Sequence, residues 1–302
     1  MSGTVEEIAA KMDGLGLWDA FPPCHWAICP SGSVFPYFCA VLKGERAPVK
    51  VRFLLVEGWQ TFHDFVRTRI DRNFGFYLTP MEMPHFELVI LSTGEMKLFR
   101  HDPCFMPREA NAAERKLCAK LLWEAYGVML RIETDRGLPM KFAAEKAMFS
   151  RVEDAGGGWS DRALAIPDPR PYVENLRFAK DDLAKAKDLP FFADEAWELD
   201  FRLLVNVMTQ EKRPRCVYEL IAFDTETGER LVSDRISPVP DGGLKAMWES
   251  VPPRVLKHFL LRGRVPGAVR LLSGRLFRML RPLCVDLPFK LSLCDSLPRL
   301  RD

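Results

Sequence analysis

The sequence lacks any long apolar run. No stretch approaches the roughly 18–20 consecutive apolar residues that a helix needs to cross a bilayer. Residues 1–13 contain Glu6, Glu7 and Asp13 and lack the apolar segment of a secretory signal. We therefore expect no membrane partner and a cytoplasmic location.

Closely spaced cysteines are also missing. The eight cysteines are scattered along 302 residues, unlike the dense spacing of a small secreted domain held together by disulfides. Two segments combine Cys with His: Cys24-His25 with Cys29, and His101 with Cys104. Neither has the paired ligand spacing of a structural zinc site. We expect reduced thiols, no metal and no other cofactor.

Glycine loops that bind phosphate are absent as well. Gly156-Gly157-Gly158 lies between two expected strands, and Gly14-x-Gly16 follows a helix and has no third glycine. Asp224 and Glu226 are paired carboxylates, but they flank residues that hairpin turns select. We interpret them as a turn and find no sequence support for nucleotide binding.

The sequence carries little net charge, +2, but the charge is unevenly distributed. From Pro252 to the C-terminus there are eleven Lys and Arg against three Asp. Such a split is typical of an end that binds a polyanion. It also fits a basic helix face that pairs with the acidic remainder of the chain.

The N-terminal half combines strand and helix patterns. Its clearest element is a helix over residues 112–133, with Asn111 as the N-cap and Glu114 in capping-box position. Its expected buried stripe is Leu117, Leu121, Ala125, Val128 and Ile132. The other expected elements are helices at 4–13 and from 59, and strands at 34–42, 49–56, 86–92, 96–100, 140–152 and 162–166.

The C-terminal half has the order β-β-β-α-β-α-β. Strands are expected at 197–208, 216–223, 229–236, 268–273 and 290–294, and helices from 243 to 262 and at 275–283. The proline-rich segment 166–171 is the expected boundary between domains 1–170 and 171–302. The predicted class is α+β, with an N-terminal mixed or antiparallel sheet packed by a long helix and a C-terminal mixed sheet.

Several short motifs in the C-terminal half resemble a bacterial domain family of unknown function. They are Arg213-Pro214, Leu220–Gly228, Val265-Pro266 and Leu297-Pro298. The N-terminal half, with Pro107 before the 112–133 helix, resembles a second uncharacterised domain that accompanies the first. The resemblance implies a two-domain bacterial protein and no particular activity.

The C-terminal element order is also similar to the ribonuclease H-like fold. Nucleases of that fold hold two metal ions with convergent carboxylates. The resemblance implies Asp200 for the first strand and Glu249 for the first helix, whereas Ser273-Gly274 stands where a further acid is expected. A metal-dependent nucleic-acid-processing enzyme using Asp200 and Glu249 is therefore the alternative hypothesis.

The leading hypothesis is a non-enzymatic binding or scaffold protein whose basic C-terminal helices contact a polyanion. Its partner would be a nucleic acid or a protein. The residues expected to contact phosphates are Arg254, Arg262, Arg264, Arg275 and Arg278, accompanied by Lys257, His258, Arg270 and Arg281.

Overall fold

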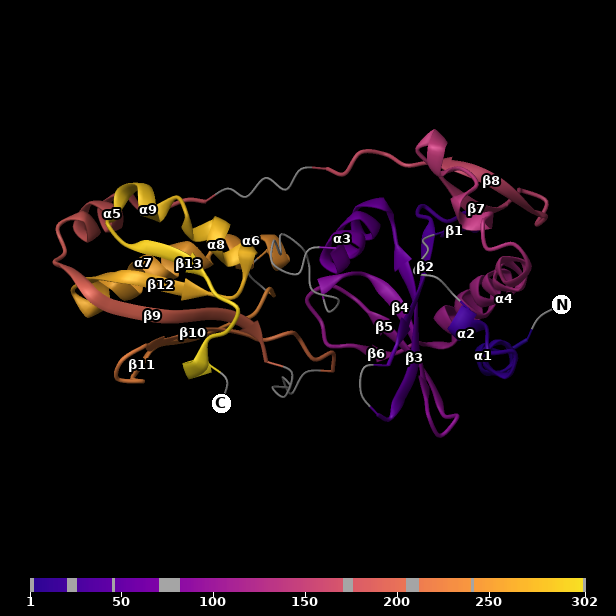
Figure 1. Cartoon of the computed structure of the whole chain (residues 1–302), viewed down its shortest axis with the longest axis horizontal. Helices are drawn as coiled ribbons and strands as arrows, with labels where there is room; N and C mark the ends of the chain where they lie inside the picture. Colours follow the sequence, from indigo (N-terminus) through magenta and orange to yellow (C-terminus); the bar gives the residue numbers. More distant parts are fainter. Residues whose placement is uncertain are drawn as a thin grey trace. The chain divides into compact units, whose positions relative to one another are not determined.

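The computed structural model describes residues 3–20, 26–44, 47–70, 82–170, 176–204, 212–239 and 242–300. The chain divides into two compact units. The N-terminal unit comprises Met1–Val66, Met83–Asp102 and Pro107–Arg170, and the C-terminal unit comprises Arg67–Glu82, Pro103–Met106 and Pro171–Asp302. Helices and mixed sheets are both present (Figure 1), so the predicted α+β class is confirmed.

The N-terminal unit is built on an eight-stranded sheet with the order β6-β5-β4-β3-β2-β1-β7-β8. All neighbours are antiparallel except β1 and β7, which are parallel. The strands are β1 (Trp26–Cys29), β2 (Tyr37–Lys43), β3 (Val49–Glu57), β4 (His85–Leu91), β5 (Met96–His101), β6 (Arg108–Glu109), β7 (Ala147–Glu153) and β8 (Trp159–Ala165).

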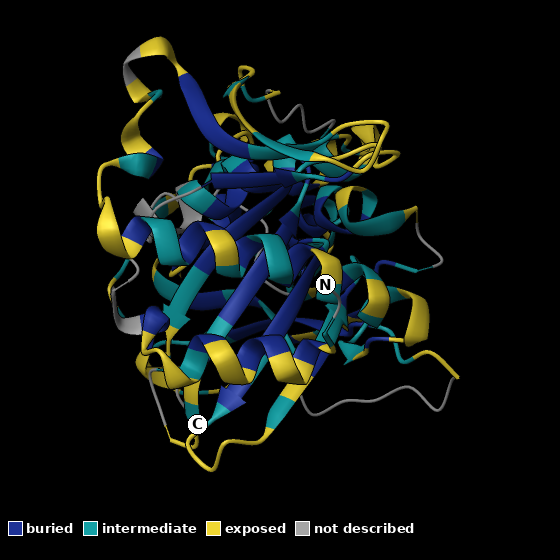
Figure 2. Ribbon diagram, turned by 90° about the vertical axis from the view of Figure 1, so that its right-hand side faces the viewer, coloured by how far each residue is buried: buried dark blue, intermediate teal, exposed yellow. Residues whose placement is uncertain are grey.

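Helices cover both faces of this sheet. On one face, α1 (Val5–Gly14), α2 (Leu17–Ala20) and α4 (Ala112–Thr134) share a core with Phe53, Phe86 and Leu88. Figure 2 looks onto this side, and the strands behind the helices are mostly buried. On the other face, α3 (Trp59–Ile70) stacks Phe62 on Phe38 of β2, with ring centroids 4.3 Å apart.

The long helix α4 begins at the predicted capping box. The Asn111 side chain accepts from the Glu114 N–H at 3.0 Å, and the Glu114 carboxylate accepts from the Asn111 N–H at 2.8 Å. Arg108 adds two hydrogen bonds to the same carboxylate, at 2.7 and 2.6 Å. The expected stripe is buried at Leu121, Ala125, Val128 and Ile132, whereas Leu117 is only partly buried.

The C-terminal unit is built on a five-stranded sheet with the order β11-β10-β9-β12-β13. Strand β10 is antiparallel to both of its neighbours, β9 and β11, and β12 is parallel to both β9 and β13. The elements are α5 (Lys180–Lys187), β9 (Phe191–Leu203), β10 (Tyr218–Asp224), β11 (Arg230–Ile236), α6 (Gly243–Glu249), α7 (Val251–Arg262), β12 (Val265–Leu271), α8 (Gly274–Leu280), α9 (Leu283–Asp286), β13 (Lys290–Leu293) and η4 (Pro298–Leu300).

The two faces of the C-terminal sheet differ. Trp197 packs against Phe259 of α7 at 5.1 Å, and Phe201 packs against Trp248 of α6 at 4.8 Å. Because side chains alternate along a strand, Glu198 and Asp200 point to the opposite face. There Ile221 of β10, the partner of Asp200, packs with Leu297 and Leu300.

The sequence patterns missed several short elements, among them β1 and α5. Strand β1 lies between β2 and β7, and its Trp26, Ala27 and Ile28 are all buried, so it shows no alternation of apolar and polar residues. Helix α5 buries only Ala186 and has almost no apolar stripe. The strand expected from Met140 begins at Ala147, because two short 3₁₀ helices, Leu138–Met140 and Ala143–Glu145, come first.

Among the described residues, none of the helices combines the length and the apolar composition that a membrane crossing requires.

The capping box of α4 makes the first prediction. Asn111→Ala removes the side-chain acceptor at the start of the helix, so we expect the free energy of unfolding to fall by about 1 kcal/mol. Urea denaturation of the full chain measures this change. Asn111→Asp, which keeps the acceptor, is the control, and equal losses in both variants would contradict this role of the cap.

Candidate functional sites

One side of α7 lines a groove in the C-terminal unit. The helix buries Val255, Leu256 and Phe259, and the helical period therefore turns Arg254, Lys257 and His258 outward. The groove encloses about 530 Å³, and its charged lining residues are Arg177, Asp234, Glu249, Arg254, Lys257 and His258. The sequence thus brings basic side chains from the start of α7 together with Arg177 from before α5.

Each of the two acids that line this groove has a partner of its own. His258 Nε2–H donates to Asp234 Oδ2 at 2.9 Å, and Glu249 lies 3.8 Å from Lys245. Within the described part of the chain, Arg177, Arg254 and Lys257 form no ion pair with a carboxylate. Three positive charges in the groove are therefore available to an anion.

The groove does not contain a nucleophilic triad. Ser250 lies at the start of α7 and donates its hydroxyl to Met247 O at 2.7 Å. It precedes His258 by eight residues, which is a rise of about 12 Å along a helix. Ser250 and His258 are thus too far apart to exchange a proton.

The five arginines expected to form one basic surface lie in different surroundings. Arg254 lines the groove. Arg262 donates two bonds to Glu229 Oε1, at 2.9 and 3.0 Å, and Arg264 pairs with Glu195 at 2.5 Å. Arg275 is 5% exposed and lies 4.0 Å from the Trp248 ring centroid, and Arg278 on the same helix is partly buried.

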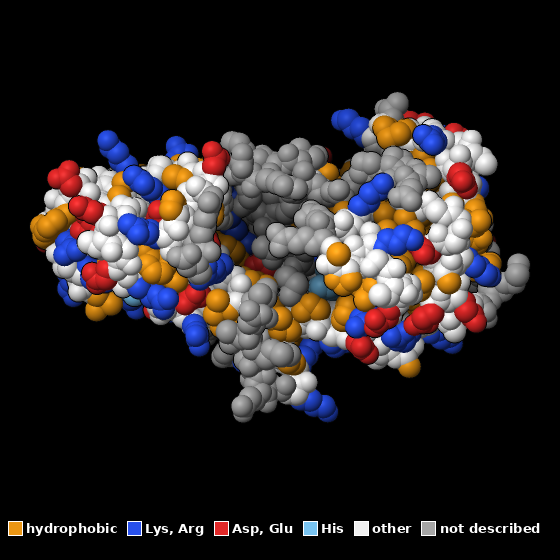
Figure 3. Space-filling model, turned by 60° about the horizontal axis from the view of Figure 1, so that its bottom comes forward, with side chains coloured by type: hydrophobic (Ala, Val, Ile, Leu, Met, Phe, Trp, Pro, Cys, Tyr) orange, Lys and Arg blue, Asp and Glu red, His pale blue; other side chains and the backbone are white. Residues whose placement is uncertain are grey.

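These arginines therefore do not form a continuous stripe. The acids that pair with Arg262 and Arg264 come from β9 and the turn before β11, in the same unit as the arginines. On the face seen in Figure 3, Lys and Arg are interspersed with Asp and Glu on both units.

The structure does not bring Asp200 and Glu249 together. Asp200 lies on the face of β9 opposite Leu199 and Phe201, whereas α6, which carries Glu249, packs on the Leu199 and Phe201 face. The five-stranded sheet separates the two carboxyl groups. Two-metal chemistry needs carboxylates that converge on ions about 3.5–4 Å apart, and this pair does not converge.

The surroundings of Asp200 favour its neutral form. Burial raises the pKa of its carboxyl group, and the Phe201 N–H that it accepts at 2.9 Å and the nearby Arg202 offset this effect only in part. At the end of β12, where the nuclease comparison expects a further acid, Ser273 caps α8 by accepting from the Leu276 N–H at 3.2 Å.

The turn interpretation of Asp224 and Glu226 is confirmed. Asp224 Oδ1 accepts from the Glu226 N–H at 2.9 Å and from the Thr227 N–H and hydroxyl at 2.7 and 3.0 Å. Burial acts to raise the pKa of Asp224, but these hydrogen bonds outweigh it and lower the pKa. Of the Cys/His segment near the N-terminus, Cys24 and His25 lie outside the described residues.

A buried cluster of two imidazoles and a carboxylate lies on β4 and β5. His85 and His101 are directly opposed in the antiparallel pair, and Glu87 follows His85 on the same face. Their exposed fractions are 2%, 4% and 5%. The imidazole rings stack with centroids 4.0 Å apart and planes 16° apart.

Hydrogen bonds define which ring nitrogens carry protons. His85 Nδ1 lies 2.9 Å from Met83 O, and His101 Nε2 lies 2.7 Å from Glu87 Oε2. Both acceptors are oxygens, so these nitrogens are the donors. Among the described groups, the opposite nitrogens, His85 Nε2 and His101 Nδ1, are buried and have no hydrogen-bond partner. Leaving a buried polar atom without a hydrogen-bond partner costs about 1–3 kcal/mol.

The pKa values of His85 and Glu87 keep each of these two groups in one charge state at neutral pH. Burial, and then the neighbouring His101, lower the pKa of His85 to about 3. Burial acts to raise the pKa of Glu87, but hydrogen bonds from His101 and Arg52 outweigh it and lower the pKa to about 2. His85 is thus neutral and Glu87 is ionised.

A second groove, of about 670 Å³, lies between α1, α4 and β8 in the N-terminal unit. Its lining includes Trp123, Trp159, Arg115 and Lys120. Arg115 pairs with Glu6 at 2.5 Å and Lys120 with Glu153 at 2.6 Å. Its third cation, Lys116, has no ion pair among the described residues, but Glu6 and Glu124 also line the groove, so it is less suited to an anion than the α7 groove.

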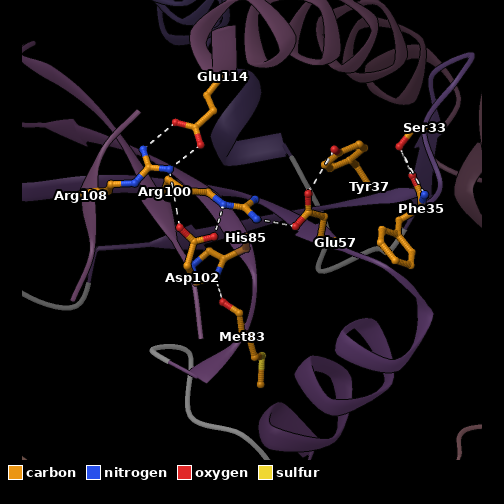
Figure 4. Close-up of polar contacts among 10 residues, drawn as sticks. All are labelled: Ser33, Phe35, Tyr37, Glu57, Met83, His85, Arg100, Asp102, Arg108 and Glu114. Atoms are coloured by element: carbon orange, nitrogen blue, oxygen red, sulfur yellow. Dashed lines mark hydrogen bonds and ion pairs between the residues drawn. The ribbon is translucent and has the colours of Figure 1, made fainter. Parts of the chain in front are cut away.

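A chain of ion pairs on the α4 side of the N-terminal sheet is structural. Figure 4 shows Arg100 between Glu57, at 2.7 Å, and Asp102, at 2.8 Å. Arg108 continues the chain from Asp102 to Glu114 of the capping box. Every charge has an opposite neighbour, and the network ties β3, β5 and β6 to the start of α4.

The C-terminal unit contains a further buried acid. Glu82 is fully buried, and its Oε1 accepts from the Tyr218 hydroxyl at 3.1 Å and from Trp248 Nε1 at 2.9 Å. Burial and then Glu82 raise the pKa of Tyr218, which stays protonated as a donor. These contacts fix the aromatic ring against which Arg275 packs.

Comparisons with known proteins give no relative. No protein-family model matches the chain, and no curated protein and no solved structure matches it.

The position of Asp200 makes the second prediction. A carboxyl group whose pKa is raised by folding contributes stability below its ordinary pKa and loses it as pH rises through the folded value. At pH 7, well above the ordinary pKa of a carboxyl group, the raised pKa of Asp200 therefore lowers the stability of the fold. Asp200→Asn keeps an oxygen for the Phe201 N–H without the charge, so we expect a higher urea midpoint at pH 7 and a smaller gain below about pH 4.

Asp224→Asn is the matched control, because folding lowers the pKa of Asp224 and the expected change at pH 7 has the opposite sign. A lower urea midpoint for Asp200→Asn at pH 7 would show that the ionised carboxylate is needed where it lies.

Proposed function

We propose that the protein is a non-enzymatic binding module that holds a polyanion against the outward side of α7. The observation that carries this proposal is the set of three cations, Arg177, Arg254 and Lys257, that share one groove without a carboxylate partner in the described part of the chain. Phosphate groups are the ligand chemistry that such a groove fits, and nucleic acid is the polyanion that we propose.

The lining indicates how the nucleic acid is held. The apolar lining residues are Ala246, Pro253 and Leu261, and the described lining contains no Phe, Tyr or Trp. Base stacking needs an aromatic platform, so the contacts are to the phosphate backbone. Backbone contacts position a nucleic acid without reading its sequence, and the module binds with little sequence preference.

The fold of the C-terminal unit is part of the same proposal. Three antiparallel strands are followed by a helix, a parallel strand, a helix and a final parallel strand. This succession supports a ribonuclease H-like fold and, with the N-terminal unit, a two-domain bacterial protein. The separation of Asp200 from Glu249 favours the binding role over the metal-dependent enzyme.

A cytoplasmic location belongs to the proposal too. Within the described part of the chain no two cysteines form a disulfide, and Cys118 and Cys216 are buried. Reduced cysteines without disulfides are typical of a reducing compartment, which supports a cytoplasmic site of action.

Salt dependence tests the binding function. For a fluorescently labelled 20-nucleotide DNA, single-stranded or duplex, three phosphate contacts predict a slope of log K against log salt of about −2 to −3. Arg254→Gln/Lys257→Gln should weaken binding about tenfold or more and reduce the slope to about −1. Fluorescence anisotropy at several salt concentrations measures both quantities.

Arg270→Gln/Arg281→Gln removes the same charge from two exposed residues outside the groove and is the control. We expect its affinity and slope to match the wild type. Equal losses in the two double variants would indicate a general charge effect, and an absence of salt-sensitive binding by the wild type would refute the proposal.

A further inference from the structure

We propose that His85, Glu87 and His101 of the N-terminal unit form a binding site for a divalent transition-metal ion. One ligand atom from each of the three residues can be chosen so that all lie within 4.8 Å of one another. This site is in a different unit from the α7 groove, so the two proposals do not depend on each other.

The strand register produces the site. His85 and His101 are partners across β4 and β5, and Glu87 is two residues further along β4. Side chains two residues apart on a strand share a face, so the three functional groups reach the same region. Two ligands about 2.1 Å from one ion are at most about 4.2 Å apart. The ligand atoms, which lie within 4.8 Å of one another, must therefore move closer together when an ion binds.

The ring protons of His85 and His101 are on the nitrogens that do not bind the metal. His85 Nδ1–H is held by Met83 O, and His101 Nε2–H is held by Glu87 Oε2. Imidazoles that bind a metal typically donate their other N–H to a backbone carbonyl or a carboxylate. The other nitrogens, His85 Nε2 and His101 Nδ1, keep their lone pairs. Both are buried, and no described group donates a hydrogen bond to them. A metal ion would satisfy both.

The Glu87 carboxylate that holds the His101 proton is itself fixed in orientation. Arg52 Nε donates to its Oε1 and balances its charge. In the stacked arrangement the two ring planes are nearly parallel, so the lone pairs lie in separate planes. Binding must therefore turn the rings apart so that the lone pairs converge.

The ligand set selects the class of ion. The two ligands that the rings supply, His85 Nε2 and His101 Nδ1, are imidazole nitrogens, with Glu87 orienting His101. Imidazole suits Zn²⁺ and other transition metals, whereas Mg²⁺ and Ca²⁺ prefer oxygen ligands. We therefore expect Zn²⁺ and Co²⁺ to bind and Mg²⁺ in large excess to leave them in place.

Histidine NMR on the full-length, tag-free protein tests the site directly. After dialysis against a chelator, Zn²⁺ should shift the ¹⁵N resonances of His85 Nε2 and His101 Nδ1, and Co²⁺ should produce visible absorption bands. The free cysteines also bind Zn²⁺, so the ring-nitrogen shifts are decisive. Zn²⁺ that binds without shifting these two nitrogens would be held by thiols and would refute the site.

Variants measure the contribution of each ligand. His85→Gln and His101→Gln should weaken the Zn²⁺ binding that gives these shifts at least about 100-fold, and Glu87→Gln at least about tenfold. The control is His63→Gln on α3, whose ring contacts Pro167 O and lies on the protein surface. Affinity unchanged in folded His85→Gln would contradict the proposal, and the wild-type NMR result decides it if the variants do not fold.

Discussion

The alternation of side chains along a paired strand is the constraint on which both units depend. A residue's face is fixed once the register is fixed, because successive side chains point to opposite sides. In the N-terminal unit, the register of β4 with β5 assigns Phe86 and Leu88 to the core with α4 and leaves His85 and Glu87 on the other face with His101. Polar and apolar residues thus alternate along β4 and lie in different environments.

The same constraint places on opposite faces of the sheet two carboxylates that the order of elements alone would assign to one site. Asp200 and Glu249 stand in the positions implied by the nuclease resemblance, yet β9 assigns Asp200 to the face opposite α6. An order of elements fixes a topology but not the face on which each side chain lies. Function assigned from fold order alone is therefore weak evidence, and the register must be known before carboxylates are paired.

Local signals in the sequence predict much of the fold. The α4 helix is predictable because its cap, Asn111, and its apolar stripe are both local. Strand β1 is not, because burial on both faces removes the alternation that identifies a strand. The partners of Arg262 and Arg275 could not be predicted from local sequence, because Glu229 and Trp248 lie about 30 residues away along the chain. His85 and His101 each lie one residue outside the expected strands 86–92 and 96–100, and the His85-x-Glu87 spacing was the only local signal of the buried cluster.

The two proposed sites use opposite electrostatic strategies. The α7 groove keeps its cations near solvent, where each contact is weak and is screened by salt, so binding depends on several phosphates acting together. The β4–β5 cluster removes three polar groups from water, and burial then makes every unpaired lone pair costly. A surface groove can lose one cation and still bind, whereas a buried site needs all its ligands. Because burial raises the cost of an incomplete site, the orphaned nitrogens of His85 and His101 are stronger evidence for a ligand than any single exposed arginine.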